Sequence, residues 1–382
     1  MRRSMTPWFR KFVYGTTTPL ASIFGSGFLV IVAVLADSVG PYALPAMAGI
    51  CFVAYGVGAI IRFNIRYAEP VLEAGKATGI TSLFERIADI ALVPAYVISV
   101  TLYIRILASY GLGFLGNNTE YNQRALTTGI ILFILFIGIT KGLRVLEGLE
   151  RWALITTMAI IALMIVAFFV HDMGVLYNGG LILPDITDQS LWQIVTVLGG
   201  SLIVVQGFET TRYLGDEFDA PTRIAASRNA QIVSTIVYIL LVGLATPIMY
   251  VLSDDVADNA LMDLAMAVAV WLPLPLVIAA IFSQFSAATA DTIGASGNML
   301  EFTGHKIPVR LTYLIICGFA ILLTWSAETF EILTLASRAF AFYYFMQCLV
   351  AFSVATTNKQ RGVFLLAAAG LLFITIFAVP VG

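Results

Sequence analysis

Long runs of apolar residues are the feature that most constrains the fold of this chain. The runs are roughly 18–25 residues long, which is the length of helix that crosses the hydrocarbon core of a bilayer. Of the 382 residues, 59% are hydrophobic and 12% are charged, whereas a soluble domain carries about 25% charged residues. Short alternating segments, typical of membrane barrels, are absent. The chain is therefore predicted to be an all-α protein embedded in the lipid bilayer.

About eleven transmembrane helices are expected. They are placed at residues 15–37, 42–63, 88–113, 124–141, 150–170, 190–215, 228–252, 271–301, 309–326, 328–354 and 362–380. With residues 1–14 as a cytoplasmic N-terminal tail, 18 of the 21 basic residues fall on the cytoplasmic side and only Arg124 falls outside. Basic residues concentrate in cytoplasmic segments of membrane proteins. This predicts a multi-pass protein of the cell (inner) membrane with its N-terminus in the cytoplasm.

Four charged residues lie deep inside the predicted spans, away from their cytoplasmic ends, namely Arg105, Glu209, Asp291 and Arg338. A charge at this depth is costly, and it usually pairs with another charge or lines an interior pathway. One interpretation is a closed set of ion pairs between the arginines and the acids. Alternatively, the arginines bind an acidic group of a substrate, or Glu209 is a protonation switch, because burial disfavours the charged form of a carboxylate.

Two of the predicted spans are interrupted near mid-depth. The first contains Phe24-Gly25-Ser26-Gly27-Phe28, and the sixth contains Val205-Gln206-Gly207-Phe208-Glu209. Each glycine weakens a helix by roughly 1 kcal/mol relative to alanine, and an open helix exposes backbone N–H and C=O groups. Interrupted segments at matching places in two halves indicate a transporter site built on discontinuous helices.

The two interruptions are 182 residues apart, from Gly25 to Gly207. Shifting the first five spans by that length places them near the sixth to tenth. Because five spans end on the opposite side of the membrane, the second set must run inverted. The sequence thus predicts a five-plus-five inverted repeat, with residues 15–170 and 190–354 as the halves and 362–380 as an additional helix.

Several motifs resemble one family. Gly207-Phe208-Glu209, followed by Glu217, Pro221 and Arg223, resembles the sixth-helix signature of the amino acid–polyamine–organocation (APC) superfamily. This chain has Asp219-Ala220-Pro221 where that family commonly has Asn-Pro. Gly25-Ser26-Gly27-Phe28 is similar to the family's first-helix motif, and Tyr67-Ala68-Glu69 to a motif after its second helix.

The resemblance implies the fold of the bacterial leucine transporter, with unwound first and sixth helices around a central substrate, and alternating access. Unpaired N–H groups at the first break would hold a substrate carboxylate, and carbonyl groups at the second would hold its amino group. The substrate-binding residues predicted in this way are Ser22, Gly25, Ser26, Gly27, Val205, Gly207, Phe208 and Glu209, together with Arg105 and Arg338.

The sequence does not determine whether transport is coupled to sodium or to protons. The fifth span lacks the lysine that many proton-coupled relatives carry. In the eighth span, Ala288, Asp291 and Thr292 recur on one helix face, and with carbonyls of Ala21 and Phe24 they resemble a sodium site. Asp291 could otherwise take part in proton coupling or in a structural pair. A sodium ion is the one cofactor considered.

The expected function is a secondary active transporter for an amino acid or related small amine, driven by a sodium or proton gradient. It is not expected to be an enzyme or to bind nucleic acid, because Walker, zinc and Ser-His-Asp motifs are absent. Two alternative functions are considered. A passive channel would show flux that does not saturate, and a membrane sensor of the same fold would bind ligand without counterflow. The substrate, symport versus antiport and the oligomeric state are not given by the sequence.

Overall fold

The structure is a computed structural model that describes residues 7–25, 27–146, 149–180, 182–186, 188–215, 217–252 and 257–381. Side chains are described from Gly15 onward, except at positions 144, 146 and 149. Helices and the turns between them make up these ranges, in which there is no strand. This confirms the all-α prediction.

The first span is divided into α1 (Pro7–Ile23) and α2 (Gly27–Val39). After a short 3₁₀ turn, α3 (Ala43–Phe63) runs back and continues into a π-helical turn and α4 (Glu69–Glu73). The predicted break in the first span is therefore present, and it lies at the glycines, which tolerate an open backbone.

The next three helices are long and continuous. They are α5 (Gly79–Phe114), α6 (Glu120–Thr140) and α7 (Leu149–Asn178). The α5 helix has 36 residues and begins at a Thr78 N-cap, nine residues before the predicted start of the span. At 1.5 Å per residue it is longer than the bilayer core, and the charged residues Glu85 and Arg86 lie in its first turns, before the predicted span.

The sixth span is the second broken one. It consists of α8 (Leu191–Gly200) and two 3₁₀ segments, Leu202–Val205 and Phe208–Leu214. The remaining helices are α9 (Ala220–Ala245), α10 (Leu261–Val268), α11 (Pro273–Phe302), α12 (Val309–Ser326), α13 (Thr329–Val354) and α14 (Asn358–Phe377).

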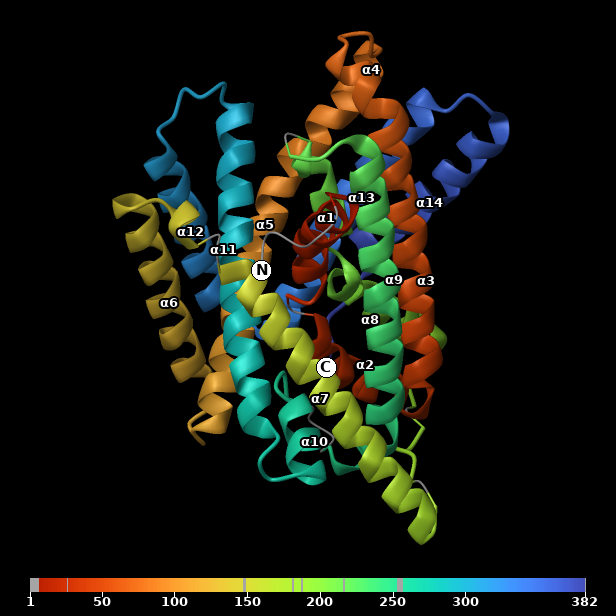
Figure 1. Ribbon diagram of the computed structural model, residues 1–382, viewed down its shortest axis with the longest axis vertical. Helices are drawn as coiled ribbons and strands as arrows, with labels where there is room; N and C mark the ends of the chain where they lie inside the picture. Colours follow the sequence, from red (N-terminus) through yellow and green to blue (C-terminus); the bar gives the residue numbers. More distant parts are fainter. Residues whose placement is uncertain are drawn as a thin grey trace.

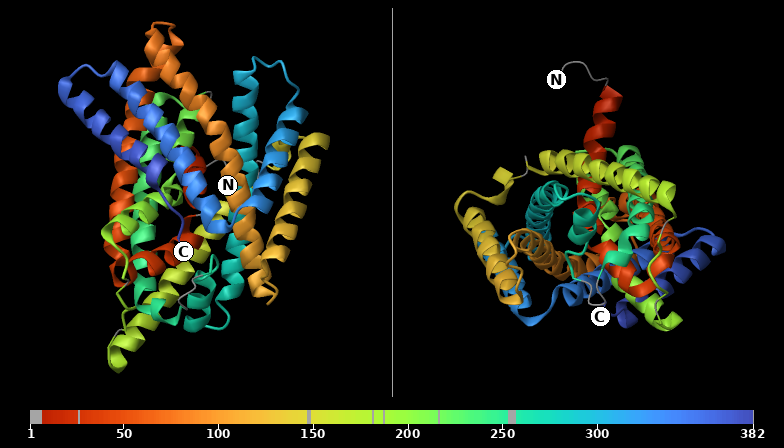
Figure 2. Two further views of the ribbon diagram at one scale, coloured as in Figure 1. Left: turned by 180° about the vertical axis from the view of Figure 1, so that it is seen from behind. Right: turned by 90° about the horizontal axis from the view of Figure 1, so that it is seen from below.

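Within the described residues, nine runs are long and apolar enough to cross a membrane, and the first of them, Gly15–Glu73, contains two predicted spans. The short helix α8 begins the broken sixth span. The nine runs thus hold ten predicted spans, and the broken span that begins with α8 is the eleventh. Figure 1 shows most of them side by side along the long axis, with α6 and α12 at one edge and α14 near the other, and Figure 2 shows the same arrangement from behind.

The α5 helix lies at the centre and packs against α11 and α13. Further packed pairs are α3 with α9, α6 with α12, and α13 with α14. An inverted repeat would bring α5 beside α11 and α6 beside α12, because these are equivalent spans of the two halves. The repeat symmetry and the domain boundaries remain predictions.

Candidate functional site

The two helix breaks touch each other in the middle of the protein. Gly207 has φ +125°, and a Cβ there would lie 2.6 Å from the Ile23 nitrogen and 2.7 Å from Ser22 Oγ. The buried Tyr238 hydroxyl lies 3.0 Å from the Ile23 carbonyl oxygen and 2.9 Å from the Val204 carbonyl oxygen. A glycine is therefore required at position 207 both by its backbone conformation and by the close approach of the first break.

The first break lies between α1 and α2. The amide of Gly25 donates to the Ser22 carbonyl at 3.0 Å, and the side-chain amide of Gln284 from α11 donates to the Gly25 carbonyl. A Cβ at Gly27 would overlap the Tyr238 hydroxyl and the Val204 carbonyl. Gly25 and Gly27 are thus closely surrounded by protein atoms, which leaves no room for a side chain at either position. The predicted ligand Ser26 lies outside the described residues, and the role of these residues in binding substrate stays a prediction.

Glu209 is fully buried at the second break. Its Oε2 atom accepts hydrogen bonds from the Gly207 amide at 2.8 Å and from the Tyr344 hydroxyl at 2.7 Å. Phe208 stacks on the Tyr344 ring with centroids 5.4 Å apart. The second oxygen, Oε1, has no hydrogen-bond partner in the part of the chain that the structure describes. The Oε1 atom of Glu209 is therefore available to accept a further hydrogen bond.

The predicted pairing of Glu209 or Asp291 with Arg105 or Arg338 is wrong. Arg105 Nη2 donates to Glu120 Oε1 at 2.8 Å, because α6 begins at Glu120 beside the far end of α5. Arg338 donates to the carbonyls of Thr375 and Ile376 at 2.8 and 2.5 Å. Those carbonyls belong to the last turn of α14, where a cation satisfies unpaired C=O groups and the helix dipole.

Asp291 is a second buried carboxylate near the breaks. It accepts a hydrogen bond from the Ser99 hydroxyl of α5, and it is close enough to Glu209 for the two charges to repel each other. Tyr96 and Tyr103, on the same helix as Ser99, are also buried. Among the described residues, neither Asp291 nor Glu209 forms an ion pair with a basic side chain.

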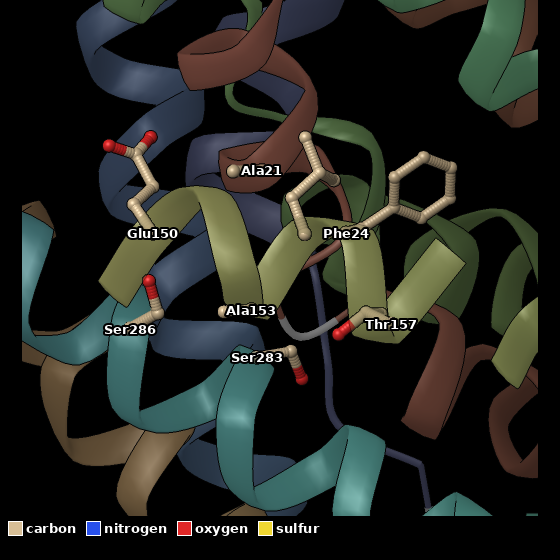
Figure 3. A pocket seen from close by; sticks show the side chains of 8 residues that line it. Ala21, Phe24, Glu150, Ala153, Thr157, Ser283 and Ser286 are labelled. Atoms are coloured by element: carbon tan, nitrogen blue, oxygen red, sulfur yellow. The ribbon is translucent and has the colours of Figure 1, made fainter. Parts of the chain in front are cut away.

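A small cavity lies between α1, α7 and α11 (Figure 3). Its volume is about 10 Å³, roughly enough for the centre of one water molecule or ion. Its walls include Ala21 from α1, Phe24 from the turn after it, Thr157 from α7, and Ser283 and Ser286 from α11. The Thr157 hydroxyl is buried without a hydrogen-bond partner among the described residues.

The predicted sodium ligands are therefore only partly brought together. Ala21 and Phe24 line this cavity, but Ala288, Asp291 and Thr292 do not. Asp291 follows Ser283 by eight residues, a rotation of roughly 80° about the helix axis, and so faces α5 instead. The Thr292 hydroxyl donates to the carbonyl of Ala288 at 2.7 Å, within its own helix.

A third polar group lies where the sixth span ends. Arg223 Nη2 donates to Glu69 Oε2 at 2.7 Å, while Arg212 Nη2 donates to Glu85 Oε1 at 2.8 Å and its Nε to Glu69 Oε1 at 3.3 Å. These ion pairs tie α4, α5, the 3₁₀ segment after the second break and α9 together. We call Glu69, Glu85, Arg212 and Arg223 the inner network, because the basic loops predict this side to be cytoplasmic.

Several residues of these groups were not predicted from the sequence, namely Tyr344, Thr157, Ser283, Ser286 and Gln284. Serine, threonine and glutamine are common in membrane helices, and their side chains carry no signal about which neighbouring helix they face. Glu69 and Arg223 were noted only as parts of family motifs. Their direct contact, 154 residues apart in sequence, is the physical link between those motifs.

Comparison with known proteins agrees with this geometry. A family model described as APC superfamily transporter matches residues 9–379. An uncharacterized protein of Aquifex aeolicus (strain VF5) is 38% identical over 368 residues, which cover 94% of this chain and 89% of that protein.

Among solved structures, crystal structures of mutants of a manganese transporter from Eremococcus coleocola are similar to this chain. Two of them have TM-scores of 0.56 and 0.55, each with 12% identity, and each comparison covers 98% of this chain and 87% of the transporter. At this identity the likeness concerns the fold.

Proposed function

This chain belongs to the APC superfamily of transporters, and from that premise we propose that it is a secondary active transporter for an amino acid or related small amine, coupled to a cation gradient. The observation that carries the proposal is the pair of buried carboxylates, Glu209 and Asp291, at the centre of the molecule. Removing a carboxylate from water is costly unless a positive group compensates it. A bound amine, cation or proton would supply that compensation.

The arrangement of the breaks suits a zwitterion. The α2 helix starts at Gly27, and the first amides of a helix have no partner within it and carry partial positive charge. They would receive the substrate carboxylate, with Ser26 beside them. The free Oε1 of Glu209 would accept the amino group, and Phe208, held against Tyr344, would contact the substrate side chain.

For the coupling ion, we propose the cavity between α1, α7 and α11. Its lining residues include Ala21, Phe24, Thr157, Ser283 and Ser286; their backbone carbonyls and hydroxyls would provide oxygen ligands, which suit a hard cation such as sodium. Closing the site would join α1 to α11. Asp291 would then hold a proton or add negative charge near the substrate.

Manganese is a less suitable substrate for this set of residues. The likeness to a manganese transporter concerns the fold, at 12% identity. In the described ranges, no three or more His, Cys, Asp or Glu residues are grouped so as to hold a metal ion.

The test is uptake by purified protein in liposomes. Labelled amino acids, small amines and manganese are offered under a sodium gradient, a proton gradient or neither. The proposal expects saturable accumulation of an amino acid or amine above equilibrium under one of the gradients. Accumulation of manganese alone, flux that never saturates, or binding without counterflow would each contradict it.

A further inference from the structure

Three arginines at one edge of the protein have no carboxylate partner among the described residues. Arg66, in the π-helical turn after α3, and Arg228, in the third turn of α9, are both exposed, and neither forms a hydrogen bond or ion pair with another described residue. Arg62 is buried between the same helices. It donates to Gln231 Oε1 and, at 3.4 Å each, to the Ser227 hydroxyl and the Tyr55 carbonyl, all of which are neutral acceptors.

The arginines at this edge lack a carboxylate partner within the described ranges, whereas arginines close to them have one. On the other side of the same segments, Arg212 and Arg223 are neutralised by Glu69 and Glu85. The nearby carboxylate of Asp219 is engaged as the N-cap of α9, since its Oδ1 accepts the Thr222 amide at 3.1 Å. The edge formed by Arg62, Arg66 and Arg228 therefore has excess positive charge, and Arg62 and Arg228 are close enough to repel each other.

A cavity lies between the two exposed arginines. Its volume is about 320 Å³, and it is lined by Arg66 and Arg228 together with the small apolar residues Ala220, Pro221, Ile224 and Ala225. This volume falls within the range of roughly 300–1,000 Å³ that small-molecule sites occupy. Two guanidinium groups on an apolar wall suit a ligand with one anionic group and an apolar remainder.

The depth of the cavity suggests the source of that ligand. Arg66 follows the end of the transmembrane helix α3, and Arg228 lies near the start of α9, so both are near the boundary between lipid and water. Further along the same helices, Tyr55, Ile232 and Ile236 are exposed and would face acyl chains. The basic loops predict that this boundary is the cytoplasmic one.

We propose that this cavity binds the phosphate group of an anionic phospholipid. Arg66 and Arg228 would donate charge-assisted hydrogen bonds to the phosphate oxygens, and the exposed side chains of α3 and α9 would contact the acyl chains. Basic pockets between transmembrane helices are suited to anionic headgroups. Because Arg66 is three residues before Glu69 in the inner network, bound lipid would also hold α4 and α9 in place.

The experiment measures binding to the purified full-length protein after delipidation in a neutral detergent. Dioleoyl phosphatidylglycerol, dioleoyl phosphatidylcholine and inorganic phosphate are titrated separately, with native mass spectrometry and thermal unfolding as readouts. The proteins compared are the wild type, the R66Q/R228Q variant, and the matched control K306Q/R310Q, which removes two exposed basic residues, one in the loop before α12 and one in its first turn.

The expected result is that phosphatidylglycerol binds to the wild type and the control and raises their Tm, whereas phosphatidylcholine and phosphate do not. In R66Q/R228Q the dissociation constant for phosphatidylglycerol should rise roughly 30-fold, with the Tm in the absence of lipid unchanged because both side chains are exposed. Equal binding by R66Q/R228Q would overturn the site. Equal effects of phosphatidylcholine or of phosphate alone would overturn the assignment to an anionic lipid.

Discussion

Glu209 and Asp291 differ in their surroundings from the buried arginines that form ion pairs. Arg105, Arg212 and Arg223 each contact a carboxylate, whereas the two central acids contact only hydroxyl and amide groups in the described part of the chain. Hydrogen bonds stabilise a buried carboxylate, but they do not cancel its charge. A positively charged ligand would therefore gain favourable electrostatic free energy by binding next to these two acids.

Replacing Glu209 with glutamine tests this role. Glu209→Gln keeps the size of the side chain and its contact with Tyr344, but it removes the charge that would attract an amine. Loss of a charged hydrogen bond is expected to raise the substrate dissociation constant about 10- to 100-fold. The measurement is substrate binding by thermal shift, together with uptake in liposomes.

The matched control for this variant is Glu217→Gln, which removes an exposed carboxylate shortly after the same 3₁₀ segment. It should leave binding unchanged. Normal substrate affinity in Glu209→Gln would show that the amine is held elsewhere.

Thr157 is the residue to change at the proposed ion site, because its buried hydroxyl has no partner among the described residues. Thr157→Val has nearly the same shape without the oxygen. The sodium concentration for half-maximal uptake should rise about tenfold, with little change in the affinity for substrate at saturating sodium. Thr156→Val, on the adjacent position of α7 and outside the cavity lining, is the control; equal sodium dependence in both variants would exclude Thr157 as a ligand.

At the scale of single residues, the sequence indicated the positions of residues that are unusual for their depth, while their roles stay predictions. Glu209 was predicted to matter because a carboxylate in a membrane span is costly, and Gly207 because it interrupts an apolar helix. Partners could not be predicted in the same way. An ion pair between Arg105 and Glu209 was one interpretation of the sequence, but Arg105 pairs with Glu120. The length of α5 and the position at which α6 begins determine which acidic side chain lies close to Arg105.

At the scale of elements, the breaks in the first and sixth spans were predictable and the contacts between elements were not. Glycine and polar residues weaken a helix locally, so a break leaves a trace in the sequence. The inner network joins residues from four segments, and it depends on how α4 and the 3₁₀ segment Phe208–Leu214 pack together. Such packing is a tertiary property without a local pattern.

The inner network should contribute strongly to stability through Glu69, which contacts both Arg212 and Arg223. Glu69→Gln would leave Arg223 without a carboxylate, and removing one partner of a buried pair costs about 3 kcal/mol or more. Glu85→Gln should cost less, because Arg212 keeps Glu69. The measurement is the Tm in detergent, with Glu73→Gln, an exposed residue of α4, as the control.

A Tm for Glu69→Gln equal to that of Glu73→Gln would mean that the network is not needed to hold these segments together. A smaller loss in Glu69→Gln than in Glu85→Gln would assign the main contact to Arg212 and Glu85 instead.

At the scale of the whole molecule, composition and charge predicted most of the architecture. The number of spans follows from the apolar runs, because lipid requires each run to close its own backbone hydrogen bonds. The uneven distribution of basic residues predicts the orientation. The position of the last helix was not evident from composition or charge. Arg338 of α13 donates to the carbonyls at the end of α14, so this additional helix is joined to α13.

The predicted orientation can be tested on the whole protein with a membrane-impermeant maleimide. The three native cysteines, Cys51, Cys317 and Cys348, are buried, so the background labelling should be low. Lys76→Cys places an exposed thiol in the α4–α5 loop and Asn117→Cys places one in the α5–α6 loop, which lie at opposite ends of α5. If the basic loops are cytoplasmic, Asn117→Cys is labelled in intact cells and Lys76→Cys only after permeabilisation. The reverse pattern would invert the molecule in the membrane, and would place the inner network on the outer side.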